Sequence, residues 1–215
     1  MLYSGRIMAF SFSCICLFGI QGSVKMNLSL KSLFIETITT PREVARQIIA
    51  LGISRRTSIM CVIFTICITV ILFFLDLNSS ANSIILPLLM HHPLVLAFVM
   101  IFGTIWSAFV IGFFGKILGG NDNIDNILVL LAWGQAVQVG FQVMATLIAF
   151  LSIQLAALFQ LGVFFIYIWI FISFIDVALK FENLFKAFFV TFSGLIAAFI
   201  SVSMVLSLVV GLFNV

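Results

Sequence analysis

The chain has 215 residues, of which 64% are hydrophobic and 8% are charged, and its net charge is +3. Soluble domains are about 45–50% apolar and about 25% charged, so the composition excludes an ordinary soluble enzyme fold. With 26 Phe and only three Pro, the chain is neither disordered nor collagen-like. No alternating barrel pattern is present, and the sequence therefore predicts an all-α integral membrane protein.

Residues 1–25 form an apolar N-terminal extension. Behind a single Arg6, residues 7–20 are 14 uncharged, mainly apolar residues that resemble the hydrophobic region of a signal peptide. Cleavage there, or an extra crossing, would put six of the following basic residues outside, against the positive-inside rule. Two alternatives remain, a cleaved export signal and a native start at Met26.

Residues 26–56 are predicted to be a short cytoplasmic amphipathic lead-in. Thr40, Pro41 and Glu43 match a capping box, with Thr40 as the N-cap, Pro41 at the first helical position and Glu43 three residues after the cap. We therefore expect a helix that begins at this point, and a second short helix over residues 28–38.

The helix that follows Thr40 should have one apolar face. Val44, Ile48 and Leu51 share that face, and Gly52 is the expected C-terminal stop. The face can lie along the inner leaflet, with the Arg side chains near lipid head groups, or it can pack against the underside of the membrane domain. The sequence leaves both arrangements open.

Residues 57–215 are predicted to be a transmembrane domain of five helices. Crossing a hydrocarbon core of about 30 Å takes about 20 apolar residues. The 50 uncharged residues between Asp125 and Asp176 must therefore fold back, and we place their turn near residues 152–154. The predicted spans are 57–75, 93–115, 127–151, 155–175 and 187–212.

The basic residues indicate how these spans are oriented. With five crossings, all ten Lys and Arg fall on one side, which the positive-inside rule assigns to the cytoplasm. We therefore expect a multi-pass protein of the cell inner (plasma) membrane, with a cytoplasmic N-terminus and the C-terminus outside. The ten residues are Arg6, Lys25, Lys31, Arg42, Arg46, Arg55, Arg56, Lys116, Lys180 and Lys186.

The third span carries the main polar feature within the membrane. Gln135, Gln138 and Gln142 are spaced three and four residues apart, and Thr146 continues the row, so they form a polar stripe on one helix face. Such residues usually face the bundle interior. They can line a path for a solute or ion, or join neighbouring helices by hydrogen bonds.

Small residues also recur at helical spacing. Gly112, Gly115 and Gly119 on the second span would let another helix approach closely, either within the chain, which the sequence favours, or in a homodimer. Residues 119–123 should end that helix and cap the next, and they lack the Lys-Ser/Thr ending of a nucleotide-binding loop.

No catalytic or cofactor motif is visible in the sequence. Cysteines have no C-x-x-C spacing and are expected to be buried apolar residues, and Asp76 and Asp176 are expected to mark span ends where water reaches them. Two adjacent histidines have no visible further metal ligands. We expect no cofactor, metal, nucleotide or nucleic acid. The cysteines are Cys14, Cys16, Cys61 and Cys67, and the histidines are His91 and His92.

Three features together resemble the prokaryotic branch of the Yip (Ypt/Rab-interacting) membrane protein family. They are the segment Thr39-Thr40-Pro41-Arg42-Glu43-Val44-Ala45-Arg46, the turn Leu118-Gly119-Gly120 with its Asn/Asp cap, and a following span with Trp133. The resemblance covers about residues 28–213 and implies five closely packed helices. Eukaryotic relatives are associated with Rab GTPases, but this chain lacks their longer N-terminal region and their Asp-Leu-Tyr-Gly-Pro sequence.

Two functions are consistent with these observations. The first is a non-enzymatic membrane organiser of the Yip class that contacts lipid, other membrane proteins or a second copy of itself. The alternative is a small transporter or channel subunit that uses the glutamine face of the third span.

The predicted orientation can be measured with C-terminal fusions. We expect a C-terminal alkaline phosphatase fusion to be active and a C-terminal green fluorescent protein fusion to be dim, because the C-terminus should lie outside. The reverse result would contradict either the number of spans or their orientation.

Overall fold

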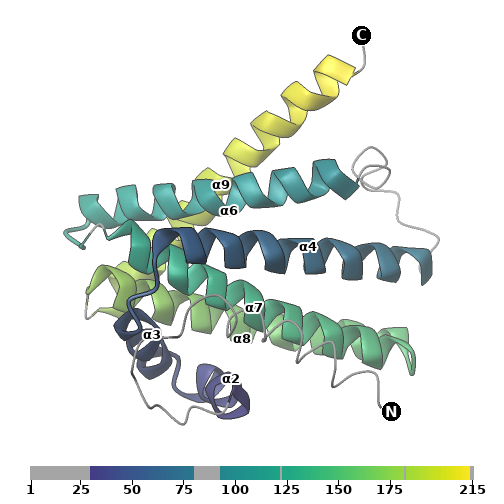
Figure 1. Cartoon of the computed structure of the whole chain (residues 1–215), viewed down its shortest axis with the longest axis horizontal. Helices are drawn as coiled ribbons and strands as arrows, with labels where there is room; N and C mark the ends of the chain where they lie inside the picture. The colour runs from purple at the N-terminus through teal and green to yellow at the C-terminus, as the bar shows by residue number, and fades with distance from the viewer. Residues whose placement is uncertain (1–29, 80–92, 122, 182, 214–215) are drawn as a thin grey trace.

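A computed structural model describes residues 30–79, 93–121, 123–181 and 183–213, all of them in helices or short connections. The expected N-terminal extension (residues 1–25) and the beginning of the lead-in lie outside the described residues. The helices are α2 (Leu30–Thr39), α3 (Pro41–Ala50), α4 (Arg55–Ser79), α6 (Pro93–Ile117), α7 (Ile124–Ala149), α8 (Ile153–Leu179) and α9 (Leu184–Phe213) (Figure 1).

Five of these helices, α4 and α6 to α9, are long and apolar enough to cross a membrane. Their 25 to 30 residues correspond to about 37–45 Å, more than a hydrocarbon core of about 30 Å. The predicted fold class is therefore confirmed, and the protein is a multi-pass helical membrane protein.

Four of the five long helices begin two or three residues before the predicted spans. The predicted spans are limited to the apolar stretch, whereas a helix extends back to the residue that caps it. Asn123 caps α7, where its side-chain oxygen accepts hydrogen bonds from the backbone N–H of Asp125 and Asn126. Ser152 caps α8 through the N–H of Leu155. The turn between α7 and α8 thus falls beside the predicted residues 152–154.

Helix α7 is the central helix of the bundle. It packs against α4 and α8, whereas α9 packs mainly against α6 and runs obliquely to the other long helices (Figure 1). In its most apolar stretch 61% of the residues of α7 are buried, against 6% for α8. Most of α8 therefore presents apolar side chains to the outside of the bundle.

The lead-in packs against the bundle rather than lying apart from it. Helix α3 contacts α8 and α7, and Val44, Ala45 and Ile48 are almost completely buried there. This decides between the two arrangements that the sequence left open. Leu51, expected on the same face, is exposed instead, because α3 has already ended at Ala50.

The predicted capping box is only partly present. Pro41 does occupy the start of α3, and Gly52 has the left-handed φ of +59° that suits a helix stop. However, the Thr40 hydroxyl donates to the Glu36 carbonyl and the Glu43 carboxylate accepts from Arg46, so the reciprocal side-chain caps are absent. The reason is that α2 runs directly into α3, and the N–H of Thr40 already bonds to Glu36.

The three glycines of the second span have different roles. A Cβ built on Gly115 would lie 2.6 Å from Cδ2 of the fully buried Leu179, so a close approach within the chain depends on this glycine. A Cβ on Gly112 would make only ordinary contacts with Ile124 and Ile127. Gly119 lies beyond α6 at φ +82° with no neighbour near its Cβ position, which corrects its expected packing role and makes it a turn residue.

We predict that Gly115→Ala destabilises the protein by about 1–3 kcal/mol, because Leu179 is enclosed by the core and has little room to move. The matched control is Gly162→Ala on α8, where a Cβ meets nothing within 4 Å and helix propensity improves. Thermal unfolding in one detergent compares the two. Equal stability of the two variants would contradict the close contact.

Candidate functional site at the charged end of the bundle

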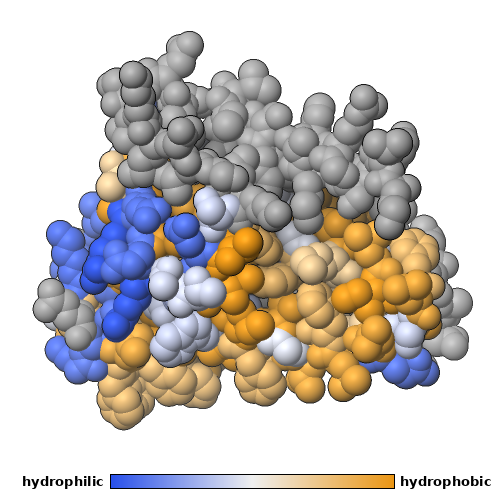
Figure 2. All heavy atoms as spheres, turned by 90° about the horizontal axis from the view of Figure 1, so that it is seen from below, coloured by the Kyte–Doolittle hydropathy of each residue, from blue (hydrophilic) through white to orange (hydrophobic). Residues whose placement is uncertain are grey.

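Three connections meet at one end of the bundle, which we call the charged end: the α2–α3 junction, the α6–α7 turn and the α8–α9 turn (Figure 1). The N–H of Asn121 donates to the Leu179 carbonyl over 2.9 Å and thereby joins the last two turns. Lys180 ends α8 in the left-handed conformation, with φ 53°. In the space-filling view of Figure 2, most of the hydrophilic residues lie at one end of the molecule.

A buried carboxylate organises the charged end. The Asp176 side chain on α8 is only 6% exposed, and its Oδ2 accepts a hydrogen bond of 2.6 Å from Nη2 of Arg42 on α3. Its Oδ1 accepts another, of 3.0 Å, from the backbone N–H of Asn183. The expectation that water reaches Asp176 is therefore wrong, because α3 covers the end of α8. Asp76, which carried the same expectation, has no described side chain.

Two further ion pairs lie at the charged end and are more exposed. Arg55 at the start of α4 pairs with Asp125 at the start of α7 over 2.5 Å, and Arg46 pairs with Glu43 within α3 over 2.7 Å. Surface pairs of this kind contribute about 0–1 kcal/mol each. The acids Glu43, Asp125 and Asp176 are therefore all engaged with arginines.

A tryptophan joins the lead-in to the centre of the bundle. Trp133 on α7 is 7% exposed, and its Nε1 donates to the hydroxyl oxygen of Thr37 on α2 over 3.1 Å. That hydroxyl in turn donates to the Leu33 carbonyl. Sequence analysis missed this pair, although a Trp near the end of a span and a Thr within an apolar lead-in were the available signals.

The glutamine row does not form one continuous lining. Gln135 lies between three helices, where its Nε2 donates to Thr104 on α6 over 2.8 Å and its Oε1 accepts from Thr65 on α4 over 3.4 Å. Gln138 is exposed on the outside of the bundle, which corrects its expected inward position, and Gln142 is half-buried. Of the three glutamines, Gln135 is the one that joins helices.

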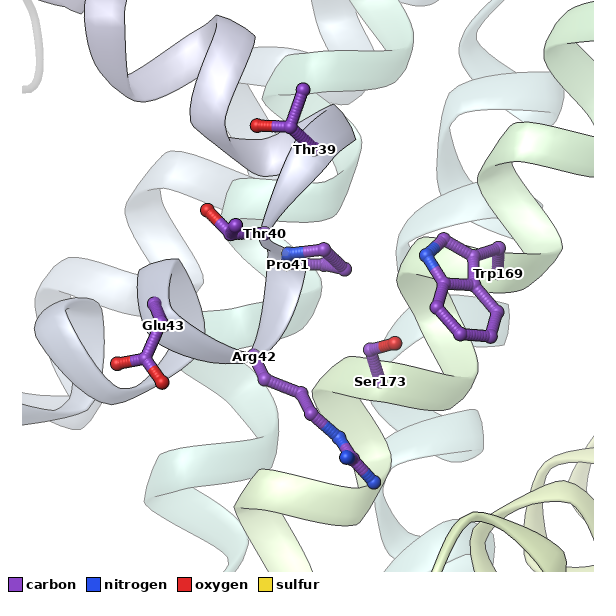
Figure 3. Close-up of a pocket in the computed structure, with 7 residues that line it drawn as sticks. All are labelled: Thr39, Thr40, Pro41, Arg42, Glu43, Trp169 and Ser173. Carbon is purple, nitrogen blue, oxygen red and sulfur yellow. The ribbon is translucent and has the colours of Figure 1, made fainter.

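Two hollows adjoin these groups. One of about 160 Å³ lies beside Gln135 and is also lined by Thr104, Ser107 and Tyr167. The other, of about 250 Å³, lies at the charged end between the α2–α3 junction and α8 (Figure 3). We call the second the interface pocket, and its lining residues are Thr39, Thr40, Pro41, Arg42, Glu43, Trp169 and Ser173.

Within the residues that the structure describes, no three His, Cys, Asp or Glu side chains come together as a metal site would require. Cys61 is half-buried and Cys67 is exposed, so the expected burial of cysteine is not observed at Cys67. The remaining cysteines and the histidine pair lie outside the described residues. They are Cys14, Cys16, His91 and His92.

Comparisons with known protein families, with curated proteins and with solved structures find no match for this chain.

We predict that Arg42→Met destabilises the protein by about 3 kcal/mol, because it leaves the Asp176 carboxylate buried without a counter-ion. The value lies at the low end of the range for buried pairs, since the Arg42 side chain is 41% exposed. The control Arg55→Met, at an exposed pair, should change stability by about 1 kcal/mol or less.

Thermal or denaturant unfolding in detergent measures both variants. Combining Arg42→Met with Asp176→Asn should recover part of the loss, because the second change removes the unpaired charge. Strictly additive losses would contradict a direct ion pair.

Proposed function

We propose that this protein is a non-enzymatic membrane organiser, which acts as a partner for other membrane proteins in the bilayer. The observation that carries the proposal is the outer face of α8. From Ile153 to Trp169 the outer side of this helix is largely uncovered by the residues that the structure describes, although its other end is firmly packed at the charged end. The exposed large apolar residues are Ile153, Leu155, Leu158, Leu161, Phe164, Phe165, Ile166 and Trp169.

The composition of this face suits a partner helix. Aromatic side chains provide large contact areas, and the neighbouring Gly162 leaves open space beside the helix. The far end of the same helix is held by Asp176 and α3, so α8 presents the outer surface on a fixed support. A rigid, aromatic, outward face is what a scaffold would offer to another membrane protein.

We further propose that the protein belongs to the prokaryotic branch of the Yip class. Of the segments that carry the resemblance, the span with Trp133 contacts Thr37, two residues before the segment Thr39–Arg46. The third segment, the turn at Leu118–Gly120, packs beside α8 through Gly120 and Phe181. The resemblance thus falls on residues that act together, which supports the assignment.

We propose that the charged end faces the cytoplasm and that the membrane is the cell inner membrane. Support comes from seven of the basic residues in the described segments, which lie on α3 or at the ends of α4, α6, α8 and α9 at the charged end. The positive-inside rule assigns such an end to the cytoplasm. These residues are Arg42, Arg46, Arg55, Arg56, Lys116, Lys180 and Lys186.

Photo-crosslinking in native membranes tests the partner role. A crosslinking residue at position 165 on the outer face of α8 should yield discrete protein adducts. The same residue at position 199 on α9, where Phe199 is equally apolar and exposed, is the control and should yield mainly lipid adducts. Lipid adducts alone at both positions would contradict a partner on α8.

The alternative is a small transporter or channel subunit, and the hollow beside Gln135, which Thr104, Ser107 and Tyr167 also line, is the observation in its favour. We predict that Gln135→Leu lowers thermal stability by about 1–2 kcal/mol, because the hydrogen bonds of Gln135 to Thr104 and Thr65 between helices are lost. The matched control Gln138→Leu, at an exposed position, should leave stability unchanged.

Solute flux in liposomes separates the two functions. If Gln135→Leu folds normally and abolishes a flux that the unmodified protein supports, the hollow is part of a path and the scaffold proposal is contradicted. If stability falls and no flux is present in either protein, Gln135 serves to hold helices together.

A further inference from the structure

We propose that the interface pocket binds the phosphate group of a membrane phospholipid, with the Ser173 hydroxyl and the Arg42 Nε as donors. This goes beyond the function proposed above and does not depend on it, because a scaffold or a transporter could hold such a lipid equally well. The pocket has a volume of about 250 Å³, several times the roughly 30 Å³ of one water molecule, and it adjoins the end of α8.

The first observation is a buried hydroxyl without a partner. Ser173 is 0% exposed, and its Oγ makes no hydrogen bond to any residue that the structure describes. Serines inside helices commonly donate to the carbonyl four residues earlier, as Ser193 and Ser201 do in this chain. In Figure 3 the Ser173 side chain lies near Pro41 and Trp169, as part of the pocket wall.

The second observation is an unused donor on Arg42. One guanidinium nitrogen, Nη2, bonds to Asp176, but Nε is buried and has no partner among the described residues. Leaving a buried donor unsatisfied costs about 1–3 kcal/mol, and more for a charged group. An acceptor with several oxygens would satisfy both Nε and the Ser173 hydroxyl, and a phosphate is such an acceptor.

The acidic residue beside the pocket does not oppose an anion there. Glu43 contributes to the lining, but its carboxylate pairs with Arg46 and points away from Ser173 and Trp169 (Figure 3). The first turn of α3 also adds the positive end of a helix dipole to the same wall.

The position of the pocket along α8 favours a lipid as the source of the phosphate. The 27 residues of α8 extend about 40 Å, about 10 Å more than the hydrocarbon core. Ser173 lies six residues before Leu179, about 9 Å from that end of the helix, so it lies close to the boundary between hydrocarbon and head groups. Trp169 lies one turn deeper, at a level where tryptophan commonly anchors proteins.

The acyl chains can leave the pocket beside Trp169. Trp169 lines the pocket and is 50% exposed, so its outer side faces the bilayer. A lipid with its phosphate in the pocket would pass its acyl chains beside Trp169 into the bilayer, and the face of α8 before Trp169 stays free for the partner proposed above.

Native mass spectrometry of the full chain, purified in mild detergent and stripped of lipid, tests the proposal. The probes are phosphatidylglycerol, diacylglycerol with the same acyl chains, and inorganic phosphate. We expect one phosphatidylglycerol to be retained per chain, with diacylglycerol at least about tenfold weaker because it lacks the acceptor. Millimolar inorganic phosphate should not displace the lipid.

Ser173→Ala should weaken phosphatidylglycerol binding about tenfold, the effect of losing one hydrogen bond to a charged acceptor. Without lipid its thermal stability should equal or exceed that of the unmodified protein, because the hydroxyl has no partner to lose and its burial without one is unfavourable. Arg42→Lys keeps a positive charge opposite Asp176 but removes Nε, and it should also weaken binding. The control Ser193→Ala should bind normally.

Three results would overturn the proposal. They are unchanged binding by Ser173→Ala, equal retention of diacylglycerol and phosphatidylglycerol, and displacement of the lipid by inorganic phosphate. The last result would identify a site for a free anion rather than for a lipid.

Discussion

The charged end of the molecule depends on one buried carboxylate. Asp176 is the one charged residue of α8 and lies near the end of that helix, where its burial would be costly without partners. Arg42 from α3 and the N–H of Asn183 before α9 supply them. A single side chain thus fixes the lead-in, the end of α8 and the start of α9 relative to one another. Because the burial of Asp176 requires α3 to be in place, the lead-in is part of the membrane domain.

Close packing at the charged end also depends on Gly115. Gly115 lets α6 approach Leu179, and the N–H of Asn121 then reaches the Leu179 carbonyl. The α6–α7 and α8–α9 turns therefore lie together and surround the Arg42–Asp176 pair. Farther along the bundle, helices are joined by single polar contacts, such as Gln135 with Thr104 and Trp106 with Ser201. The molecule therefore has a well-packed charged end and an opposite region that is open to lipid or partners.

The sequence predicted the helices better than it predicted their contacts. Length and hydropathy identify the spans, since any apolar run of about 20 residues must be helical in lipid. Gly52 and Asn123 could be assigned to helix ends because each has a local chemical reason to be there. The capping box at Thr40 failed because α2 occupies the place where a free helix end was expected, and Gln138 points outward because spacing alone does not say which face is interior.

The sequence by itself determined that this protein is a helical membrane protein with five apolar helices, because the periodicity and the scarcity of charge leave no other way to satisfy the backbone in a bilayer. Only the tertiary structure decided the roles of the few polar residues. Asp176 and Arg42 are 134 positions apart, and Trp133 and Thr37 are 96 apart. Pairings over such distances follow from how the helices pack. The burial of the Ser173 hydroxyl without a partner among the described residues could likewise be recognised only from the packing of α3 against α8.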